Sequence, residues 1–262
     1  MNIKTISLGL FGFLMAAIPQ LLSAQIMTKT IPLNGAKRVE IYMERASLDI
    51  SGHDANNIVI ETEGNKPPPD RAKGLRPLFN NAVDNTGIGI MVEESADKIV
   101  IKKASSHQLE VSIKLPQNLA LKVEEISWMG GGDYKFHAYK GEIEVKSNSA
   151  AIQLEQVSGP IVASSTSGSI DVIFAKLDQT KPSAISNISG PIDITIAADE
   201  KATFKLETIT GETYTDLNLD FGQPKDGMQS IGHRKNKGHL NGGGVELALH
   251  SISSTIYIRK KK

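Results

Sequence analysis

The feature that most constrains this chain is an isoleucine that recurs every nine residues. Ile143, Ile152, Ile161 and Ile170 keep this interval without a gap. A second apolar or small residue follows each of them by two positions, and a glycine or alanine precedes each by two. Because residues two apart point to the same face of a strand, each unit presents one apolar pair to one side. Such a fixed period is typical of stacked repeats.

The turns between these units carry the phrase Ser-Gly-x-Ile, at 158–161, 167–170 and 189–192. We expect glycine in these turns because it adopts positive φ angles at little cost. Two units make one coil of about 18–22 residues, and equivalent isoleucines of successive coils then stack at about 4.8 Å. The sequence therefore predicts an all-β fold, a single-stranded parallel β-solenoid (β-helix).

The same alternation of apolar and polar residues starts at Lys37 and extends through the first half of the chain. After Ile170 the step lengthens to 22 residues at Ile192 and 21 at Thr213, which predicts that these coils follow one another in order. No segment shows the i, i+3, i+4 pattern of a helix. An antiparallel sandwich is the alternative all-β arrangement, although it does not explain a fixed nine-residue register.

The N-terminus has the features of a secretory signal peptide. Lys4 precedes an apolar run from Ile6 to Ile18, which is short for a membrane span, and small residues lead up to Ala24. We expect residues 1–24 to be the signal peptide, with an uncleaved anchor as the alternative. The mature chain is then expected to be exported to the periplasm or cell surface and not to span the membrane.

We expect residues 25–36 to form a lead-in and residues 37–262 to form one β-solenoid domain. Two stretches interrupt its rhythm, an insertion at 65–86 and a glycine-rich, basic loop at 222–243. The insertion is basic and Pro-rich, and its apolar residues are expected to pack back onto the sheet. A partner-binding loop is the alternative interpretation. Those apolar residues are Leu75, Leu78 and Phe79.

Composition excludes several function classes. Lys plus Arg equals Asp plus Glu at 29 each, so no overall charge draws the molecule to nucleic acid. There is no cysteine, which excludes disulfides, thiolate metal sites and a cysteine nucleophile. None of the six histidines shows a metal-binding spacing, and no phosphate-binding glycine loop is present. We expect no catalytic residue, cofactor or metal.

The repeat, the stretch 241–247 and the final Ile256-Tyr257-Ile258-Arg259 together resemble the bacterial putative adhesin family. Thr210-Gly211-Glu212-Thr213 and the Leu115-Pro116 turn add to this resemblance. The family is a β-solenoid domain of unknown function, related to the adhesin-head type. The resemblance implies export and a right-handed parallel sheet. It supplies no catalytic residues, and Ser254 departs from the glycine expected in the last repeat.

The best candidates for chemistry are two carboxylates. Asp171 and Asp193 each follow the inward isoleucine of successive coils, so they are expected to point outward close together. Such a pair could serve as the acid and base of a sugar-cleaving enzyme or hold Ca²⁺. The other interpretation is the polar face of an alternating strand, and it is favoured because nothing in the sequence places an arginine or an aromatic platform around the pair.

Two further surface candidates stand apart from this pair. The basic stretch with His233, Arg234, Lys235 and His239 could meet phosphate or an acidic glycan, with a solvated loop as the alternative. Trp128 could stack on a sugar, although a cap over the end of the apolar core is the favoured interpretation.

Three functions remain open. The first is a non-catalytic envelope or cell-surface module that binds glycan, an envelope protein or another copy of itself, in the manner of an adhesin or scaffold. The second is a structural or sensory partner in envelope-stress signalling. The third is a glycan-active β-helix enzyme.

Overall fold

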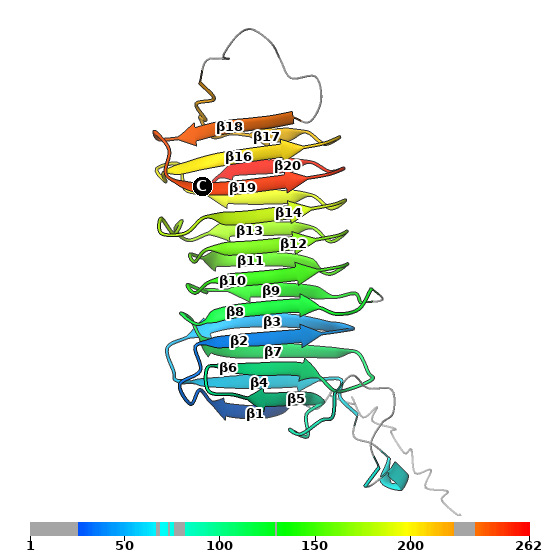
Figure 1. Ribbon diagram of the computed structural model, residues 1–262. Helices are drawn as coiled ribbons and strands as arrows, with labels where there is room; N and C mark the ends of the chain where they lie inside the picture. The colour runs from blue at the N-terminus through cyan, green and yellow to red at the C-terminus, as the bar shows by residue number, and fades with distance from the viewer. Residues whose placement is uncertain (1–25, 67–68, 73, 76–81, 129, 223–233) are drawn as a thin grey trace, which may run out of the picture.

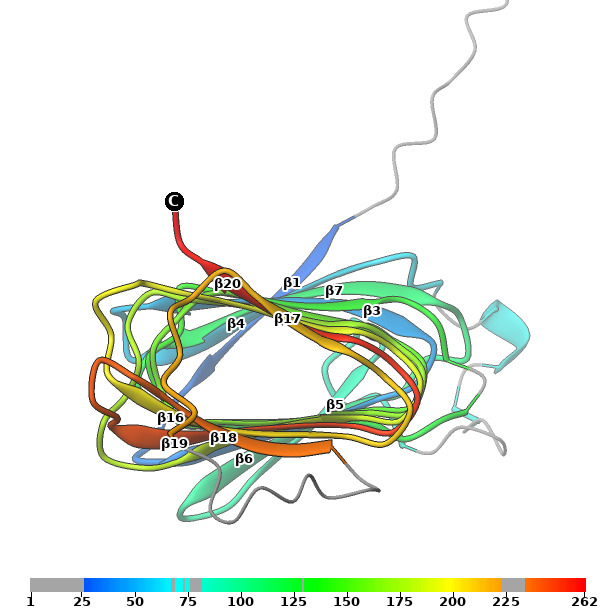
Figure 2. The ribbon, with the colours of Figure 1, turned by 90° about the horizontal axis from the view of Figure 1, so that it is seen from above.

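The computed structural model describes residues 26–66, 69–72, 74–75, 82–128, 130–222 and 234–262. Two ten-stranded sheets face each other across one apolar core. Seen from above in Figure 2, they form the two long sides of a flattened coil. The expectation of an all-β fold is confirmed, since the helical structure in the described ranges is the short 3-10 turn Asp70–Ala72.

We call the two sheets A and B, and Figure 1 shows their strands stacked along the length of the molecule. Sheet A contains, in spatial order, β1 (Met27–Pro32), β4 (Asn57–Glu63), β7 (Leu109–Pro116), β3 (Ala46–His53), β9 (Asp133–His137), β11 (Ala151–Val157), β13 (Ile170–Phe174), β15 (Ile192–Ile196), β20 (Ile256–Lys260) and β17 (Thr213–Thr215). Sheet B contains β18 (Arg234–Leu240), β16 (Ala202–Thr208), β19 (Val245–Ser251), β14 (Ser183–Asn187), β12 (Ile161–Ser165), β10 (Ile143–Ser147), β8 (Ala120–Glu125), β2 (Arg38–Met43), β6 (Lys98–Lys103) and β5 (Ile90–Glu94).

The nine-residue repeat sends successive strands alternately to the two sheets. Ile143 and Ile161 are register partners on the parallel strands β10 and β12 of sheet B. Ile152 and Ile170 are partners on the parallel strands β11 and β13 of sheet A. All four side chains are 0% exposed, so the recurring isoleucines form two facing columns inside the molecule. Their stacking is confirmed, and the antiparallel sandwich does not describe this part of the chain.

The glycines of the Ser-Gly-x-Ile turns have a different role from the one expected. Gly159, Gly168 and Gly190 are absent from the described positions with positive φ. A Cβ atom at any of the three would overlap the carbonyl oxygen of the residue stacked beside it in the preceding coil. For Gly168 that oxygen belongs to Ala150. The turn therefore requires glycine because the coils approach closely there, not because of the backbone angle.

The order of the coils in space differs from their order along the chain. Ile192 pairs with Ile256 rather than with Thr213, and Ile256 in turn pairs with Thr213. The strands β19 and β20, which come last in sequence, are thus inserted between β14–β15 and β16–β17. The prediction that the coils of Ile192 and Thr213 are neighbours is wrong. The similar step lengths along the chain favoured the sequential order. Ile256 and Ile258 nevertheless continue the isoleucine column, whereas the polar residues Thr213 and Thr215 lie one coil further out.

Both ends of the stack contain antiparallel strands, which the repeat does not predict. β1 pairs with β4, β4 with β7, and β5 with β6 at one end, while β16 pairs with β18 at the other. Strand β18 lies within 222–243, which the sequence predicts as a loop. The polar sequence of β18 does not show the apolar alternation of a strand. An edge strand pairs on one side only and tolerates charged residues, so it can form without that pattern.

The remaining sequence expectations concern the insertion and the N-terminus. Leu75 is 73% exposed, so its predicted packing onto the sheet is wrong. Leu78, Phe79 and the signal peptide at 1–24 lie outside the described residues. In the described part of the chain no helix has the length and apolar character needed to cross a membrane.

Candidate functional site

A straight row of side chains runs across the outer face of sheet A, over the strands next to its β17 edge. Asp171 on β13 is in register with Asp193 on β15, Asp193 with Tyr257 on β20, and Tyr257 with Tyr214 on β17. Parallel strands lie about 4.8 Å apart, so these four side chains are evenly spaced along the stack. Together with Arg259, two residues after Tyr257, they form what we call the tyrosine–carboxylate ladder.

The two carboxylates of the ladder have different partners. Ser169 Oγ donates a hydrogen bond to Asp171 Oδ2 at 3.0 Å. Asp193 accepts hydrogen bonds from Arg259 Nε at 2.9 and 2.8 Å, one on each oxygen. Partial burial, and to a lesser extent the charge of Asp193, raise the pKa of Asp171 despite the opposing bond from Ser169. The pair therefore combines a carboxyl that is harder to ionise with a carboxylate held by a cation.

Arg259 joins the carboxylates to the aromatic part of the ladder. Its guanidinium carbon lies 5.3 Å from the centre of the Tyr257 ring, which is cation–π geometry. The hydrogen bond to Asp193 raises the pKa of the Arg259 guanidinium, with a smaller contribution from Asp216. A cation held between a carboxylate and a ring keeps both in defined positions, so this part of the ladder is preorganised.

The tyrosines form an exposed aromatic platform at the end of sheet A. The ring centres of Tyr257 and Tyr214 are 5.9 Å apart and the ring planes differ by 18°, which is stacked geometry. Tyr214 is nevertheless 59% exposed. The two rings, Asp216 and Arg259 line a shallow hollow. Asp216 is fixed there, since its Oδ1 accepts a hydrogen bond from the Lys260 backbone at 2.6 Å.

The sequence predicts one half of this ladder and misses the other. It places Asp171 and Asp193 side by side on the outer face, which their register agrees with. The expectation that no arginine or aromatic residue surrounds them is wrong, because Arg259 and Tyr257 lie on the next strand. The signal that could have found them is the match between Ile192-Asp193-Ile194 and Ile256-Tyr257-Ile258. Sixty or so residues separate the two, and only the insertion of β20 beside β15 joins them.

The other predicted site residues do not join the ladder. Trp128 lies in the loop between β8 and β9, midway along the stack, and is 73% exposed. The interpretation that it caps the end of the core is wrong, because this loop projects from the side of the stack. Its possible contact with a sugar stays a prediction.

The basic stretch at the end of the stack is only partly described. His233 lies outside the described residues, while Arg234 and Lys235 begin strand β18. His239, on the same strand, places its Nδ1 3.3 Å from Thr203 Oγ1. Thr203 and His239 are register partners on adjacent strands, so this histidine has a structural contact within sheet B.

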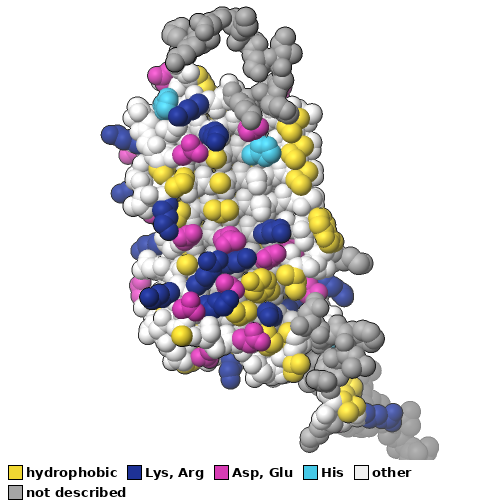
Figure 3. Space-filling view, viewed as in Figure 1, with side chains coloured by type: hydrophobic (Ala, Val, Ile, Leu, Met, Phe, Trp, Pro, Cys, Tyr) yellow, Lys and Arg dark blue, Asp and Glu magenta, His cyan; other side chains and the backbone are white. Residues whose placement is uncertain are grey.

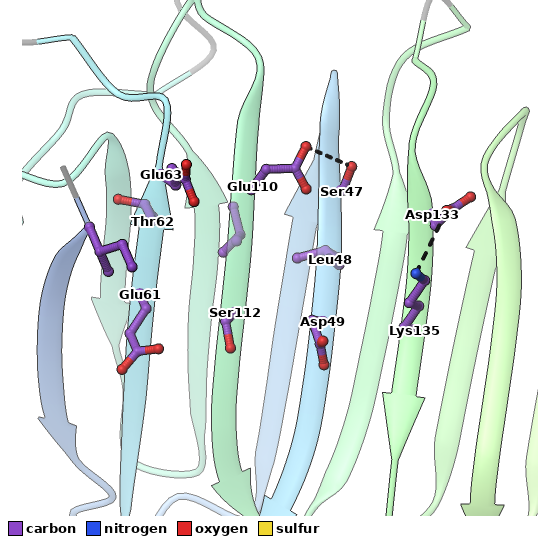
Figure 4. Close-up of a pocket in the computed structure, with 12 residues that line it drawn as sticks. Ser47, Leu48, Asp49, Glu61, Thr62, Glu63, Glu110, Ser112, Asp133 and Lys135 are labelled. Atoms are coloured by element: carbon purple, nitrogen blue, oxygen red, sulfur yellow. Dashed lines mark hydrogen bonds and ion pairs between the residues drawn. The ribbon is translucent and has the colours of Figure 1, made fainter. Parts of the chain in front are cut away.

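A second feature of sheet A is an acidic groove near its other end, shown in Figure 4. The carboxylates that line it outnumber the single lysine, Lys135, which lies 4.0 Å from Asp133. Ser47 Oγ donates to Glu110 Oε1 at 3.2 Å. In the described ranges no group of three or more acidic or histidine residues is arranged to hold a metal ion. The lining carboxylates are Asp49, Glu61, Glu63, Glu110 and Asp133.

The outer face of sheet B carries charges of both signs that neutralise one another. Figure 3 shows basic and acidic side chains interspersed over its lower half. Glu40 lies 3.4 Å from Arg38 and 3.2 Å from Lys98, and Glu144 lies 2.9 Å from Arg38 and 3.6 Å from Lys122. Exposed pairs of this kind contribute little to stability. This face therefore has the properties of a solvated surface.

The fold and the ladder define an all-β protein with two large, mostly parallel sheets and an exposed polar and aromatic face. Comparisons with known proteins found no matching family model and no matching curated protein. The solved structures that are similar include two at low identity. A putative cell adhesion protein from Clostridium sporogenes is 12% identical, with a TM-score of 0.45 and coverage of 91% of this chain and 100% of that chain. A putative adhesin from Bacteroides fragilis is 11% identical, with a TM-score of 0.34 and coverage of 91% and 98%.

Proposed function

We propose that this protein is an exported, non-catalytic binding module of the bacterial envelope, adhesin-like in role and built as a single-stranded parallel β-solenoid. Residues 1–24 are removed on export, and 37–262 act as one domain in the periplasm or at the cell surface. The observation that carries the proposal is the tyrosine–carboxylate ladder, in which Asp171, Asp193, Tyr257 and Tyr214 are aligned by strand register.

The architecture suits binding better than chemistry. The ladder lies on an open sheet face, its one hollow is shallow, and its side chains are held by strand pairing. Side chains that are already fixed lose little conformational entropy when a ligand docks, which favours affinity. A catalytic site usually lies in a cleft that excludes water, and the ladder has no such cover among the described residues.

The test is adsorption of the mature chain, residues 25–262, to envelope material from its native host. We expect saturable adsorption, with the protein recovered in the periplasmic or surface fraction of host cells. The double variant Asp193→Ala/Tyr257→Ala should lose most of this adsorption, while Lys98→Ala on sheet B should keep it. Adsorption no higher than that of an unrelated protein of similar charge would contradict the proposal.

A glycan-active enzyme is the second candidate, and one observation favours it. The pKa of Asp171 is raised by its partial burial and by the neighbouring Asp193, so the two carboxyls differ as an acid and a base must. If the protein is an enzyme, incubation with polysaccharides will release reducing ends, and either Asp171→Asn or Asp193→Asn will abolish the release. The binding proposal expects no release from the parent protein.

A further inference from the structure

We infer that the ligand of the tyrosine–carboxylate ladder is a neutral glycan chain with unsubstituted hydroxyl groups. This inference rests on the proposed binding function and adds the class of ligand. Its argument has three parts: the charges in the ladder, the exposed rings and the direction in which the ladder runs.

The charges favour a donor of hydrogen bonds that carries no negative charge. Asp193 already binds Arg259, and Asp216 lies against the Lys260 backbone. The Lys261 side chain lies at the end of β13, where its Nζ donates to Phe174 O at 3.3 Å. Acidic and basic groups around the ladder are therefore close to balance, so no net charge attracts an anionic sugar. A carboxylate offers about four acceptor positions, and Asp171 fills one of them with Ser169, so sugar hydroxyls can donate to the rest.

The exposed rings supply the apolar part of such a site. A sugar ring has polar hydroxyl edges and a face of C–H groups, and that face packs on aromatic rings. Tyr214 leaves 59% of its surface accessible although it stacks on Tyr257, so it is available for this contact. Tyr257 lies in register with Asp193 on one side and with Tyr214 on the other, so carboxylate and rings follow one another on the same face.

The direction of the ladder favours a chain over a single sugar. From β13 to β17 there are three strand intervals of about 4.8 Å, so the ladder spans roughly 14 Å perpendicular to the strands. Hydrogen-bond acceptors occupy one end of this span and aromatic rings the other. A linear oligosaccharide laid along the ladder contacts both, whereas a single sugar contacts one.

The experiment is isothermal titration calorimetry of the mature chain with two sets of probes. The neutral set contains oligosaccharides of glucan, mannan, xylan and chitin, and the anionic set contains polygalacturonate and dextran sulfate. We expect binding to at least one neutral chain and none to the anionic polymers at physiological salt. Tyr214→Ala should weaken binding roughly tenfold, in line with the loss of one stacked ring. Tyr214→Phe, which keeps the ring, should bind nearly as the parent does.

Asp171→Ala tests the acceptor end of the ladder and should also weaken binding. Val162→Ala is the matched control, because Val162 is an exposed residue on sheet B, away from the ladder. Binding to anionic polymers alone, no binding to any probe, or equal binding by Tyr214→Ala and the parent would each overturn the inference. If the chain adsorbs to host envelopes from which glycans have been removed enzymatically, this inference fails while the proposed function stands. Absence of all adsorption overturns both.

Discussion

At the scale of the residue, the most informative feature is a column of buried polar side chains at the ends of five sheet B strands. Register aligns Ser147, Ser165, Asn187, Ser251 and Thr208, and all five are at most 5% exposed. Most of them bond the backbone of the turn that follows, as when Ser251 Oγ donates to Ser254 O at 2.7 Å. Buried polar groups need such partners, so this column fixes how the chain turns from sheet B to sheet A.

Asn187 and Ser165 make a matched pair for testing this column. Asn187 Nδ2 donates to Gly168 O at 2.7 Å and its Oδ1 accepts from Gly190 N at 3.0 Å, so Asn187→Ala leaves a buried donor and a buried acceptor unpaired. We expect a loss of about 2–4 kcal/mol in the free energy of unfolding, measured by urea denaturation. Ser165 Oγ has no hydrogen-bond partner among the described residues, so Ser165→Ala should change the free energy of unfolding little. Equal effects would contradict this assignment.

Glu125 occupies the same column one coil earlier and accepts hydrogen bonds from the turn at residues 147–150. Its Oε2 accepts hydrogen bonds from Ser147 Oγ and from the backbone amides of Asn148, Ser149 and Ala150 at 2.7–3.2 Å. Burial alone would raise the pKa of Glu125, but these bonds together hold it below its ordinary value. A lowered pKa means that the folded state binds this proton less readily than the unfolded chain does.

The stability due to Glu125 should therefore be present above the pKa of the unfolded chain, about 4.3, and be lost as the pH falls through the folded value. We expect Glu125→Gln to lower the free energy of unfolding at pH 7 by about 2–3 kcal/mol. The variant should also lose less further stability than the parent between about pH 5 and pH 3. Urea denaturation across this range measures both, and parallel pH curves for the two proteins would rule the explanation out.

At the scale of the element, the short strands are specified by close contact between coils. The repeat strands bury apolar pairs such as Ile143 and Val145, and the turns at Gly159, Gly168 and Gly190 bring a glycine against the carbonyl of the coil beside it. Ala150 and Ser254 carry a side chain at the equivalent position, and their carbonyl oxygens are the ones that a Cβ atom at Gly168 or Gly211 would overlap.

Gly168→Ala should destabilise the protein strongly even though alanine is a small residue. The added methyl group would overlap Ala150 O, and that backbone is held by strand pairing on both sides. We expect a cost of about 3 kcal/mol, at the upper end for overpacking, and a lower melting temperature. Ser167→Ala changes the adjacent, exposed residue and removes one hydrogen bond to Asn148 O, so it should cost about 1 kcal/mol or less. A melting temperature of Gly168→Ala equal to that of Ser167→Ala would refute the contact.

At the scale of the whole molecule, the coil of β2 and β3 and the coil of β19 and β20 lie inside the stack and not at its ends. β2 and β3 lie between β6–β7 and β8–β9, and β19 and β20 lie between β14–β15 and β16–β17. Apart from β1, which is the edge strand of sheet A, the ends of the stack are therefore formed by strands from the interior of the sequence. Closing these contacts joins residues far apart in the chain, which costs loop entropy and slows folding.

Removal of the C-terminal segment tests this topology. In a stack that follows chain order, deleting residues 234–262 would shorten the protein and leave the rest folded. Here the deletion removes β19 and β20, which hold β16 and β17 to the remaining coils. We expect the truncated chain to lose cooperative thermal unfolding, monitored by circular dichroism. Deletion of Lys262 alone is the control and should leave unfolding unchanged. A cooperative transition in the long truncation would contradict the inserted arrangement.

The sequence alone determined the elements and the face that each presents. Alternation with a period of two and the nine-residue interval are local properties, so they predicted short strands, inward isoleucines and the outward pair Asp171 and Asp193. Only the tertiary structure decided which coils are neighbours, since any coil with an apolar pair satisfies the same columns. That choice brought Arg259 and Tyr257 beside Asp193 and completed the ladder. The spacing of residues along the chain does not indicate the order of the coils, because the contact energy that selects one order comes from packing over the whole stack.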